Sequence, residues 1–223
     1  MATQDTETSG EDSAPQARSP RRQRRRERNM AELRDAARDC FRDRGYADAT
    51  IGQITERADV AHGTFYNYYD TKDEVFAEIV DELLDELFAV VRDVGDERDI
   101  RKRLTVGIGG LFRHCAADRG LVRALHQASQ LNEAYSAKWD EFRDRLQRQV
   151  QHDLKWLQRR HLTAEIDTET MALIITRMIE GVTLHIVADS RADVDALVAG
   201  TVGMYWDAVF RPVAGDGELI LDQ

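Results

Sequence analysis

Residues 18–28 hold seven arginines and one glutamate, and they precede the first long apolar pattern of the chain. Guanidinium groups pair with phosphate oxygens, so a basic run beside a folded domain indicates contact with nucleic acid. The alternative is a solvated basic arm, and position alone does not decide between the two. We predict DNA contacts from four arginines of this run: Arg24, Arg25, Arg26 and Arg28.

Residues suited to catalysis or metal binding are few. His114 precedes Cys115, and His152 and His161 are nine positions apart. Adjacent helical residues point about 100° apart, and a nine-residue spacing only roughly repeats a helical face. The sequence also lacks a Gly-rich phosphate loop and a hydrolase elbow. We therefore expect no enzyme activity, no metal site and no cofactor.

The charge is distributed unevenly along the chain. The total is −10 at pH 7, which alone argues against a nucleic-acid partner because phosphate repels negative charge. By segment, residues 1–17 carry −4, residues 18–72 carry +4 and residues 73–223 carry −10. The basic segment is thus a separate unit, suited to DNA despite the acidic total.

The composition favours a soluble all-α protein. Hydrophobic residues make up 42% of the chain and prolines are only three, and no segment shows convincing strand alternation. The most apolar region, 171–188, is broken by Arg177, Glu180 and His185, so we expect no membrane span. The two cysteines have no metal-like spacing and suit a reducing cytoplasm.

The basic segment leads into three predicted helices. The first buries one face and ends at Gly45, a residue that readily adopts left-handed backbone. The second runs from Thr50 to about Ala58, with Thr50 and Gln53 as a capping box. A turn at Asp59 then leads into a third helix over residues 61–68. Two short helices behind a longer one are typical of a helix-turn-helix.

The run ARDCFRDRGYADATIGQITERADVAHGTFYNYYDTKDEVF (37–76) closely resembles the DNA-binding domain of the TetR/AcrR family of transcriptional regulators. The resemblance implies an all-α fold with an N-terminal three-helix helix-turn-helix domain and a C-terminal helical bundle for ligand binding and dimerisation. We accordingly divide the chain into a disordered acidic tail (1–20), a DNA-binding domain with a basic arm (21–72) and a ligand-binding and dimerisation domain (73–223).

The resemblance also implies which residues meet DNA. In the family, positions matching the third helix touch bases or phosphates, and a lysine at the start of helix four contacts the backbone. The N-terminus of helix two offers amide donors to phosphate, and an asparagine can read adenine. Beyond the arginines, the predicted contacts are Thr50, Ile51, Gly52, Ala61, His62, Gly63, Thr64, Tyr66, Asn67, Tyr68 and Lys72.

Three residues depart from the family pattern. Asp59 stands where a glycine is usual, and it tolerates left-handed backbone less freely. Ala61 replaces the usual serine cap, which should lower the stability of the third helix by about 1 kcal/mol. Gly63 should lower it by a similar amount, because glycine has a low helix propensity. We expect the third helix to be loose until DNA orders it.

Apolar periodicity predicts six long helices in the body, near 73–93, 98–117, 120–131, 133–161, 168–189 and 193–211. The helix at 168–189 is apolar nearly all round, so it must bury more than one side. The resemblance implies that the last two helices pair with their copies across a two-fold axis. A homodimer is therefore expected, with a monomer as the alternative.

A ligand pocket is expected among helices four to eight, mostly apolar with a few polar anchors. The three glycines at 107, 109 and 110 could make room for a ligand or for helix movement. His126, Glu180 and His185 are the candidate anchors. The predicted lining is Leu104, Ile108, Leu111, Phe112, Cys115, Leu125, His126, Trp139, Phe142, Leu146, Thr176, Glu180 and Thr183, with Met178 a further candidate.

These features predict a repressor that binds a near-palindromic, double-stranded operator as a homodimer. A small hydrophobic effector, such as a fatty-acyl or lipid-like molecule, would shift helix four and release the DNA. The alternatives are a transcriptional activator and a ligand-independent DNA-binding protein of the same fold.

Overall fold

The computed structural model describes residues 20–214, 217 and 219–221, and within these ranges the named elements are all α-helices. The predicted acidic tail, apart from Pro20, lies outside the described residues. The helices are α1 (Pro20–Asp48), α2 (Ile51–Arg57), α3 (His62–Phe65), α4 (Lys72–Arg92), α5 (Ile100–Ala117), α6 (Arg119–Leu131), α7 (Glu133–Arg159), α8 (Thr168–Ala188), α9 (Val194–Val209) and α10 (Arg211–Ala214).

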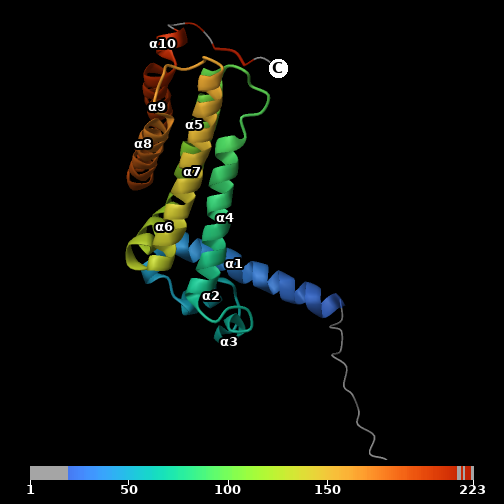
Figure 1. Cartoon of the computed structure of the whole chain (residues 1–223). Coiled ribbons are helices and arrows are strands. Elements are labelled where there is room, and N and C mark those ends of the chain that lie inside the picture. The colour runs from blue at the N-terminus through green and yellow to red at the C-terminus, as the bar shows by residue number, and fades with distance from the viewer. Residues whose placement is uncertain (1–19, 215–216, 218, 222–223) are drawn as a thin grey trace, which may run out of the picture.

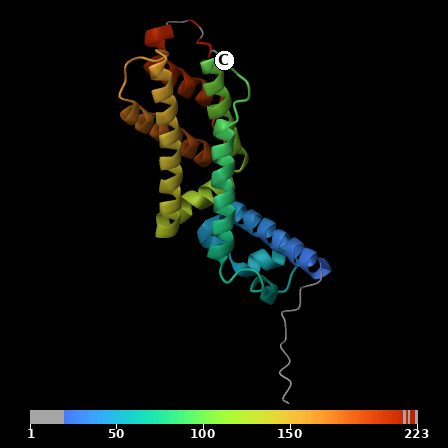
Figure 2. The ribbon, with the colours of Figure 1, turned by 45° about the vertical axis from the view of Figure 1, so that its right-hand side comes forward.

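The helices form two units joined by α4. Helices α2 and α3 lie at one end of the molecule, and α10 and the C-terminal residues lie at the other (Figure 1). Helix α1 crosses beneath the body and packs against α6, while α4 runs upward from the small unit (Figures 1 and 2). The predicted all-α fold with an N-terminal helix-turn-helix unit and a C-terminal helical bundle is confirmed.

Helix α1 is longer at its N-terminus than the sequence pattern predicts. It begins at Pro20 and therefore includes the arginine run, so the expectation of an arm preceding the first helix was wrong. Arginine is a good helix former, and proline suits the first helical position, where no amide donor is needed. Gly45 interrupts the helical geometry as predicted, with φ 83° and ψ 173°, and one further turn follows.

The turn between α2 and α3 shows why the third helix is short. Thr50 and Gln53 form the predicted capping box, and Asp59 adopts φ 51° in the turn. Ala61 supplies no side-chain cap, and regular helix ends at Phe65, whereas the sequence predicted helix to Tyr68. The chain continues as tight turns, in which the amides of Asn67 and Tyr68 bond to carbonyls three residues earlier. The missing cap and the low propensity of Gly63 account for this.

Helix α4 links the two units. Its first turn is capped by Thr71, whose hydroxyl accepts from the amide of Glu74. The carboxylate of Glu74 accepts from the amide of Asp70 and not from Thr71, so this helix start has only one half of a capping box. The buried face of α4 includes Phe76, Ile79, Leu83 and Leu87, whereas Val90 and Val91 are only partly buried.

The glycines of α5 serve helix packing. A Cβ on Gly107 would come within 2.9 Å of the Val91 carbonyl oxygen, and one on Gly110 within 2.8 Å of the Val90 side chain. These contacts bring α5 close to α4, so the suggestion that these two glycines make room for a ligand was wrong. At the far end, the amide of Ile100 donates to the carbonyl of Leu219, which ties the C-terminal residues to the α4–α5 connection.

Candidate DNA-binding surface and ligand cavity

The α3 segment presents one buried edge and one open edge. Phe65 and Tyr69 are buried and anchor it. Tyr66 is 50% exposed, and Thr64 and Tyr68 are half-buried. The other predicted contact residues of this segment are all exposed: Ala61, His62, Gly63 and Asn67. The fold thus brings the predicted DNA-facing residues together on one surface at the end of the molecule.

The predicted contacts outside α3 divide into free and engaged groups. Thr50 and Gly52 are exposed at the start of α2, while Ile51 is half-buried against the core. Lys72 is engaged within the domain: its Nζ donates to the carbonyls of Tyr46 at 2.9 Å, Ala47 at 3.2 Å and Ala49 at 3.0 Å. An ammonium has three protons, so all of them are used here, and the expected phosphate contact of Lys72 is not what the geometry favours.

The arginines of α1 lie beside the same surface. Arg24, Arg25, Arg26 and Arg28 are all exposed, and the guanidinium of Arg26 lies 5.9 Å from the centre of the Tyr68 ring. Arg28 pairs with Glu32 one turn later at 3.6 Å. Because positions 24 and 26 are about 200° apart on a helix, Arg24 projects from the face opposite Arg26. The run is thus an ordered basic helix with one side toward the α3 segment.

An ionic network joins this domain to the body, and the sequence analysis missed it. On α1, Arg34 bonds to Glu82 of α4 at 2.6 Å, and Arg38 bonds to Glu86 at 3.3 Å. The signal was present: arginines spaced by four on one helix face glutamates spaced by four on another. Such a ladder holds α1 against α4 and therefore sets the orientation of the DNA-binding domain.

Asp118 completes the connection between α1 and the body. Arg42 holds it with two bonds, Nε to Oδ1 at 2.8 Å and Nη2 to Oδ2 at 3.0 Å. Burial alone would raise the pKa of Asp118, but the bonds and charge of Arg42 outweigh it and hold the pKa below its usual value. The helices are in close contact beside this pair, because a Cβ on Gly120 would overlap the Arg42 carbonyl oxygen.

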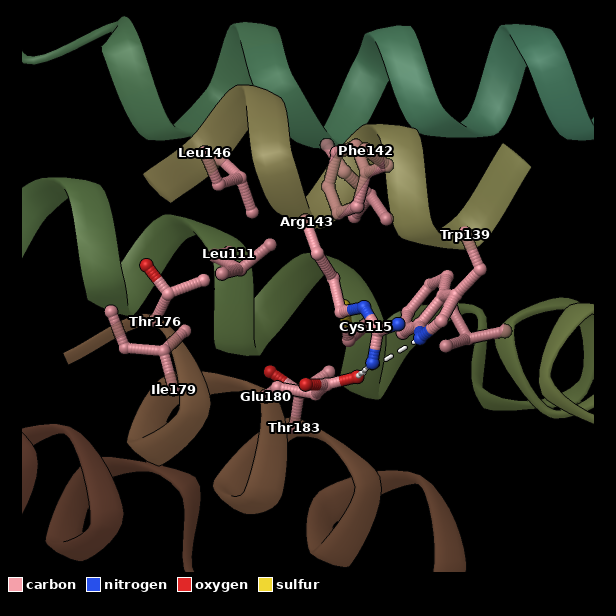
Figure 3. Close-up of a pocket in the computed structure, with 12 residues that line it drawn as sticks. Leu111, Cys115, Trp139, Phe142, Arg143, Leu146, Thr176, Ile179, Glu180 and Thr183 are labelled. Carbon is pink, nitrogen blue, oxygen red and sulfur yellow. Dashed lines mark hydrogen bonds and ion pairs between the residues drawn. The ribbon is translucent and has the colours of Figure 1, made fainter. Parts of the chain in front are cut away.

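A cavity lies within the body, between α4, α5, α6, α7 and α8. Eight predicted ligand residues line it, and all of them are labelled in Figure 3: Leu111, Cys115, Trp139, Phe142, Leu146, Thr176, Glu180 and Thr183. The sequence analysis missed four further lining residues, which follow the same helical faces: Leu87, Val122, Arg143 and Ile179. The cavity is small, with a volume of about 30 Å³, which is room for about two water molecules.

Five predicted residues do not line this cavity: Leu104, Ile108, Phe112, Leu125 and His126. On α5 the cavity spans only the turn from Leu111 to Cys115. Leu104 lies about 10 Å further along the helix axis, and Phe112 points about 100° away from Leu111. Met178 and the expected anchor His185 are also outside the lining, and His185 is exposed. Periodicity finds buried faces but not which turns of them surround a space.

Glu180 organises the polar wall of the cavity. Its carboxylate accepts from Trp139 Nε1 at 2.9 Å, from Arg143 at 3.3 Å and from Arg177 at 2.8 Å. Burial would raise the pKa of Glu180, but the bonds from Arg177 and Trp139 outweigh it and lower that pKa. The side chain of Arg143 spans the space between α7 and Glu180 of α8 (Figure 3).

An exposed apolar face runs along α8 and α9. On α8, Leu173 is 41% and Ile174 54% exposed, and on α9, Met204 is 66% exposed. Small residues accompany them, since a Cβ on Gly181, Gly200 or Gly203 would meet no atom within 4 Å. By length and composition alone, α8 is apolar enough to cross a membrane, a test that core helices of soluble proteins also pass.

The side chains considered for catalysis are poorly placed for it. Cys115 is fully buried, and burial raises the pKa of its thiol to about 12, so it stays protonated at neutral pH. His152 and His161 are both exposed on the surface. Across the described residues, no group of three or more His, Cys, Asp or Glu side chains could hold a metal ion.

Comparison with known proteins agrees with this geometry. Residues 33–79 match the family described as bacterial regulatory proteins, tetR family. The HTH-type transcriptional regulator YdgC of Bacillus subtilis (strain 168) is 27% identical over 180 residues, covering 77% of this chain and 88% of that protein. The HTH-type transcriptional repressor KstR2 of Rhodococcus jostii (strain RHA1) is 33% identical over 63 residues, covering 28% of this chain and 31% of that protein.

The likeness extends to the fold of the body. The crystal structure of a TetR transcription regulator from Haloarcula marismortui ATCC 43049 superposes with a TM-score of 0.70 at 21% identity, covering 82% of this chain and 99% of that one. The sequence match in the first domain and the structural match over most of the chain thus point to the same kind of protein. The first domain therefore matches the TetR family of bacterial regulatory proteins, and the whole chain is similar to HTH-type transcriptional regulators in sequence and shares the TetR-like fold.

Proposed function

We propose that this protein is a ligand-responsive repressor that acts in the cytoplasm and binds a near-palindromic operator as a homodimer. The observation that carries the proposal is the surface at the α3 end, where exposed His62, Gly63 and Tyr66 lie beside the arginine helix of α1. The name of the relative KstR2, a transcriptional repressor, supports the same direction of control.

The dimer is proposed from the face on α8 and α9. Exposed Leu173, Ile174 and Met204 lie among small residues, and burying such a patch against a copy of itself favours a two-fold pair. Two copies would place their α3 segments about 35 Å apart, one turn of DNA. The operator should therefore contain two inverted half-sites at that spacing.

Release would come from the cavity. It lies between α4, which begins directly after the α3 segment, and α8, which carries the exposed apolar face. An effector larger than this small cavity must move these helices. It lowers the affinity for DNA if it binds the released conformation more tightly than the DNA-bound one.

The test is selection of genomic DNA fragments by the purified full chain, followed by sequencing. We expect enriched fragments to share inverted half-sites with centres 10 to 11 base pairs apart or a multiple of one turn. Fragments without a shared sequence would contradict operator recognition. Reporter expression from the same operator then separates a repressor from an activator, because deleting the gene raises expression only for a repressor.

A further inference from the structure

The polar wall of the cavity is electrically balanced by its own side chains. Arg143 and Glu180 line the cavity and pair with each other. Each also pairs with a residue outside the lining, Arg143 with Asp140 and Glu180 with Arg177. Trp139 gives Glu180 a third donor. Because these charges already cancel, a charged ligand group would lose its hydration here without gaining a net counter-charge, which is costly. The wall therefore disfavours both anionic and cationic ligand groups.

One donor in this wall is left over. Among the described residues, two buried side-chain nitrogens have no hydrogen-bond partner, and Arg143 Nε is the one that belongs to a residue lining the cavity. The terminal nitrogens of Arg143 are held by Asp140 and Glu180, so the guanidinium is fixed and its Nε–H cannot turn to another group of the wall. This N–H can only donate, so its missing partner must be an acceptor.

The remaining wall is apolar. It is formed by leucines, a valine, an isoleucine and aromatic rings that face one another between the helices, among them Leu87, Leu111, Val122, Phe142 and Ile179. Figure 3 shows Arg143 crossing this apolar space from α7, with Leu111 and Cys115 on one side and Trp139 on the other. A ligand body that fills such a space is hydrophobic.

We propose that the effector is an uncharged molecule with an apolar body and a single hydrogen-bond acceptor, such as a ketone or ester carbonyl, that accepts from Arg143 Nε. This inference rests on the proposed function in one respect, that the cavity takes an effector. It narrows the expected class, because it excludes free fatty acids and amines as the preferred ligands.

The test compares three eight-carbon probes that differ only in the head group: octan-2-one, octanoate and octylammonium. Each is added at millimolar concentration, below its micelle range, to the purified full chain without DNA, and binding is followed by thermal unfolding and calorimetry. We expect octan-2-one to raise the unfolding temperature and to bind at least tenfold more tightly than either charged probe. Stronger binding of octanoate or octylammonium, or no stabilisation by octan-2-one, overturns the proposal.

Arg143→Lys tests the named donor, because lysine keeps the positive charge for Asp140 and Glu180 but has no Nε–H. We expect this variant to bind octan-2-one about tenfold more weakly, as for the loss of one hydrogen bond to a charged donor. Arg145→Lys is the control, because Arg145 bonds to Asp85 at the surface, and this variant should bind octan-2-one as the native chain does. Equal binding by both variants overturns the role of Nε.

The ranking of the three probes on the native chain decides the head-group class even if Arg143→Lys does not fold. Failure here is also distinguishable from failure of the proposed function. If the chain selects specific DNA but does not bind octan-2-one, the proposed DNA-binding function stands and the proposed ligand class is wrong. If the chain binds octan-2-one but selects no specific DNA, the ligand class stands and the proposed operator recognition is wrong.

Discussion

The ammonium of Lys72 sits where α1, α2 and α4 meet, and it holds three carbonyls of the connection that follows the Gly45 kink. It also lies 4.9 Å from the centre of the Tyr46 ring. The family pattern identifies this lysine as a DNA contact, whereas the structure gives it an internal role. At the scale of the residue, the same side chain can thus match a motif and do something different from what the motif implies.

Lys72→Met should lower the free energy of unfolding by about 1–3 kcal/mol, because the carbonyls lose their donor while the aliphatic stem remains. Urea unfolding measures this, with Lys138→Met as the control for an ion pair at the surface. The salt dependence of DNA binding should keep its slope. An unchanged stability together with a slope reduced by about one would show that Lys72 contacts phosphate instead.

Helix α1 performs two tasks along its length. Its first turns carry the arginines toward the α3 segment, and its later turns carry Arg34, Arg38 and Arg42, which bind α4 and Asp118. Because one continuous helix does both, a shift of the body at α6 moves the arginine run and the α2–α3 unit together. This coupling depends on the continuity of α1 and not on any single residue.

Arg26→Ala should weaken binding to DNA of every sequence and reduce the log–log salt slope by about one, because Arg26 lies beside Tyr68 on the proposed DNA-binding surface. Arg24→Ala removes the same charge from the opposite face of α1 and is the matched control. Fluorescence anisotropy over a salt series measures both slopes. Equal slopes for the two variants would contradict the orientation of the helix.

Asp118→Asn should cost about 1–2 kcal/mol of stability at pH 7, since asparagine keeps the helix cap but loses the charged bonds to Arg42. The folded pKa of Asp118 is lowered, so its contribution is complete above its usual pKa and is lost as pH falls through the folded value. The difference between native chain and variant should therefore shrink from pH 7 to pH 3.

Urea unfolding at the two pH values measures that difference. Asp85→Asn, which removes an exposed partner of Arg145, is the control and should change stability little at either pH. A difference for Asp118→Asn that stays constant on acidification would rule out the ion pair as its source.

At the scale of the molecule, the body has more apolar surface than one chain can cover. Helix α8 packs against α5, α6, α7 and α9, yet Leu173 and Ile174 remain exposed. The cavity and this face share α8, because Thr176, Ile179 and Thr183 line the cavity from the side of the helix opposite Ile174. A ligand that moves α8 would therefore also alter the proposed dimer face.

Ile174→Glu should convert the proposed dimer to a monomer, because it places a charge in the centre of the face formed by α8 and α9. Sedimentation velocity measures the change, and operator affinity should fall by more than tenfold since one half-site is lost. Leu131→Glu is the control, because Leu131 is 63% exposed at the end of α6, outside that face. A monomeric native chain would contradict the dimer itself.

Much of the fold could be predicted because it follows from local patterns. The faces of α4 and α5, the capping box at Thr50 and the left-handed turn at Asp59 each depend on residues a few positions apart. The short α3 was harder, because a poor cap and a glycine compete with a family pattern. The arginine run is helical although a block of like charge predicts an arm, because arginine is also a good helix former.

The sequence by itself determined the helices, the charge division along the chain and the residues of the proposed DNA-binding surface, because periodicity, caps and a local motif act over short distances. Only the tertiary structure decided which helical turns enclose the cavity, that Arg143 leaves a buried N–H beside it and that Lys72 is engaged internally. Those outcomes depend on how helices far apart in sequence are rotated against each other. Rotation is set by packing of the whole core, which no single segment records.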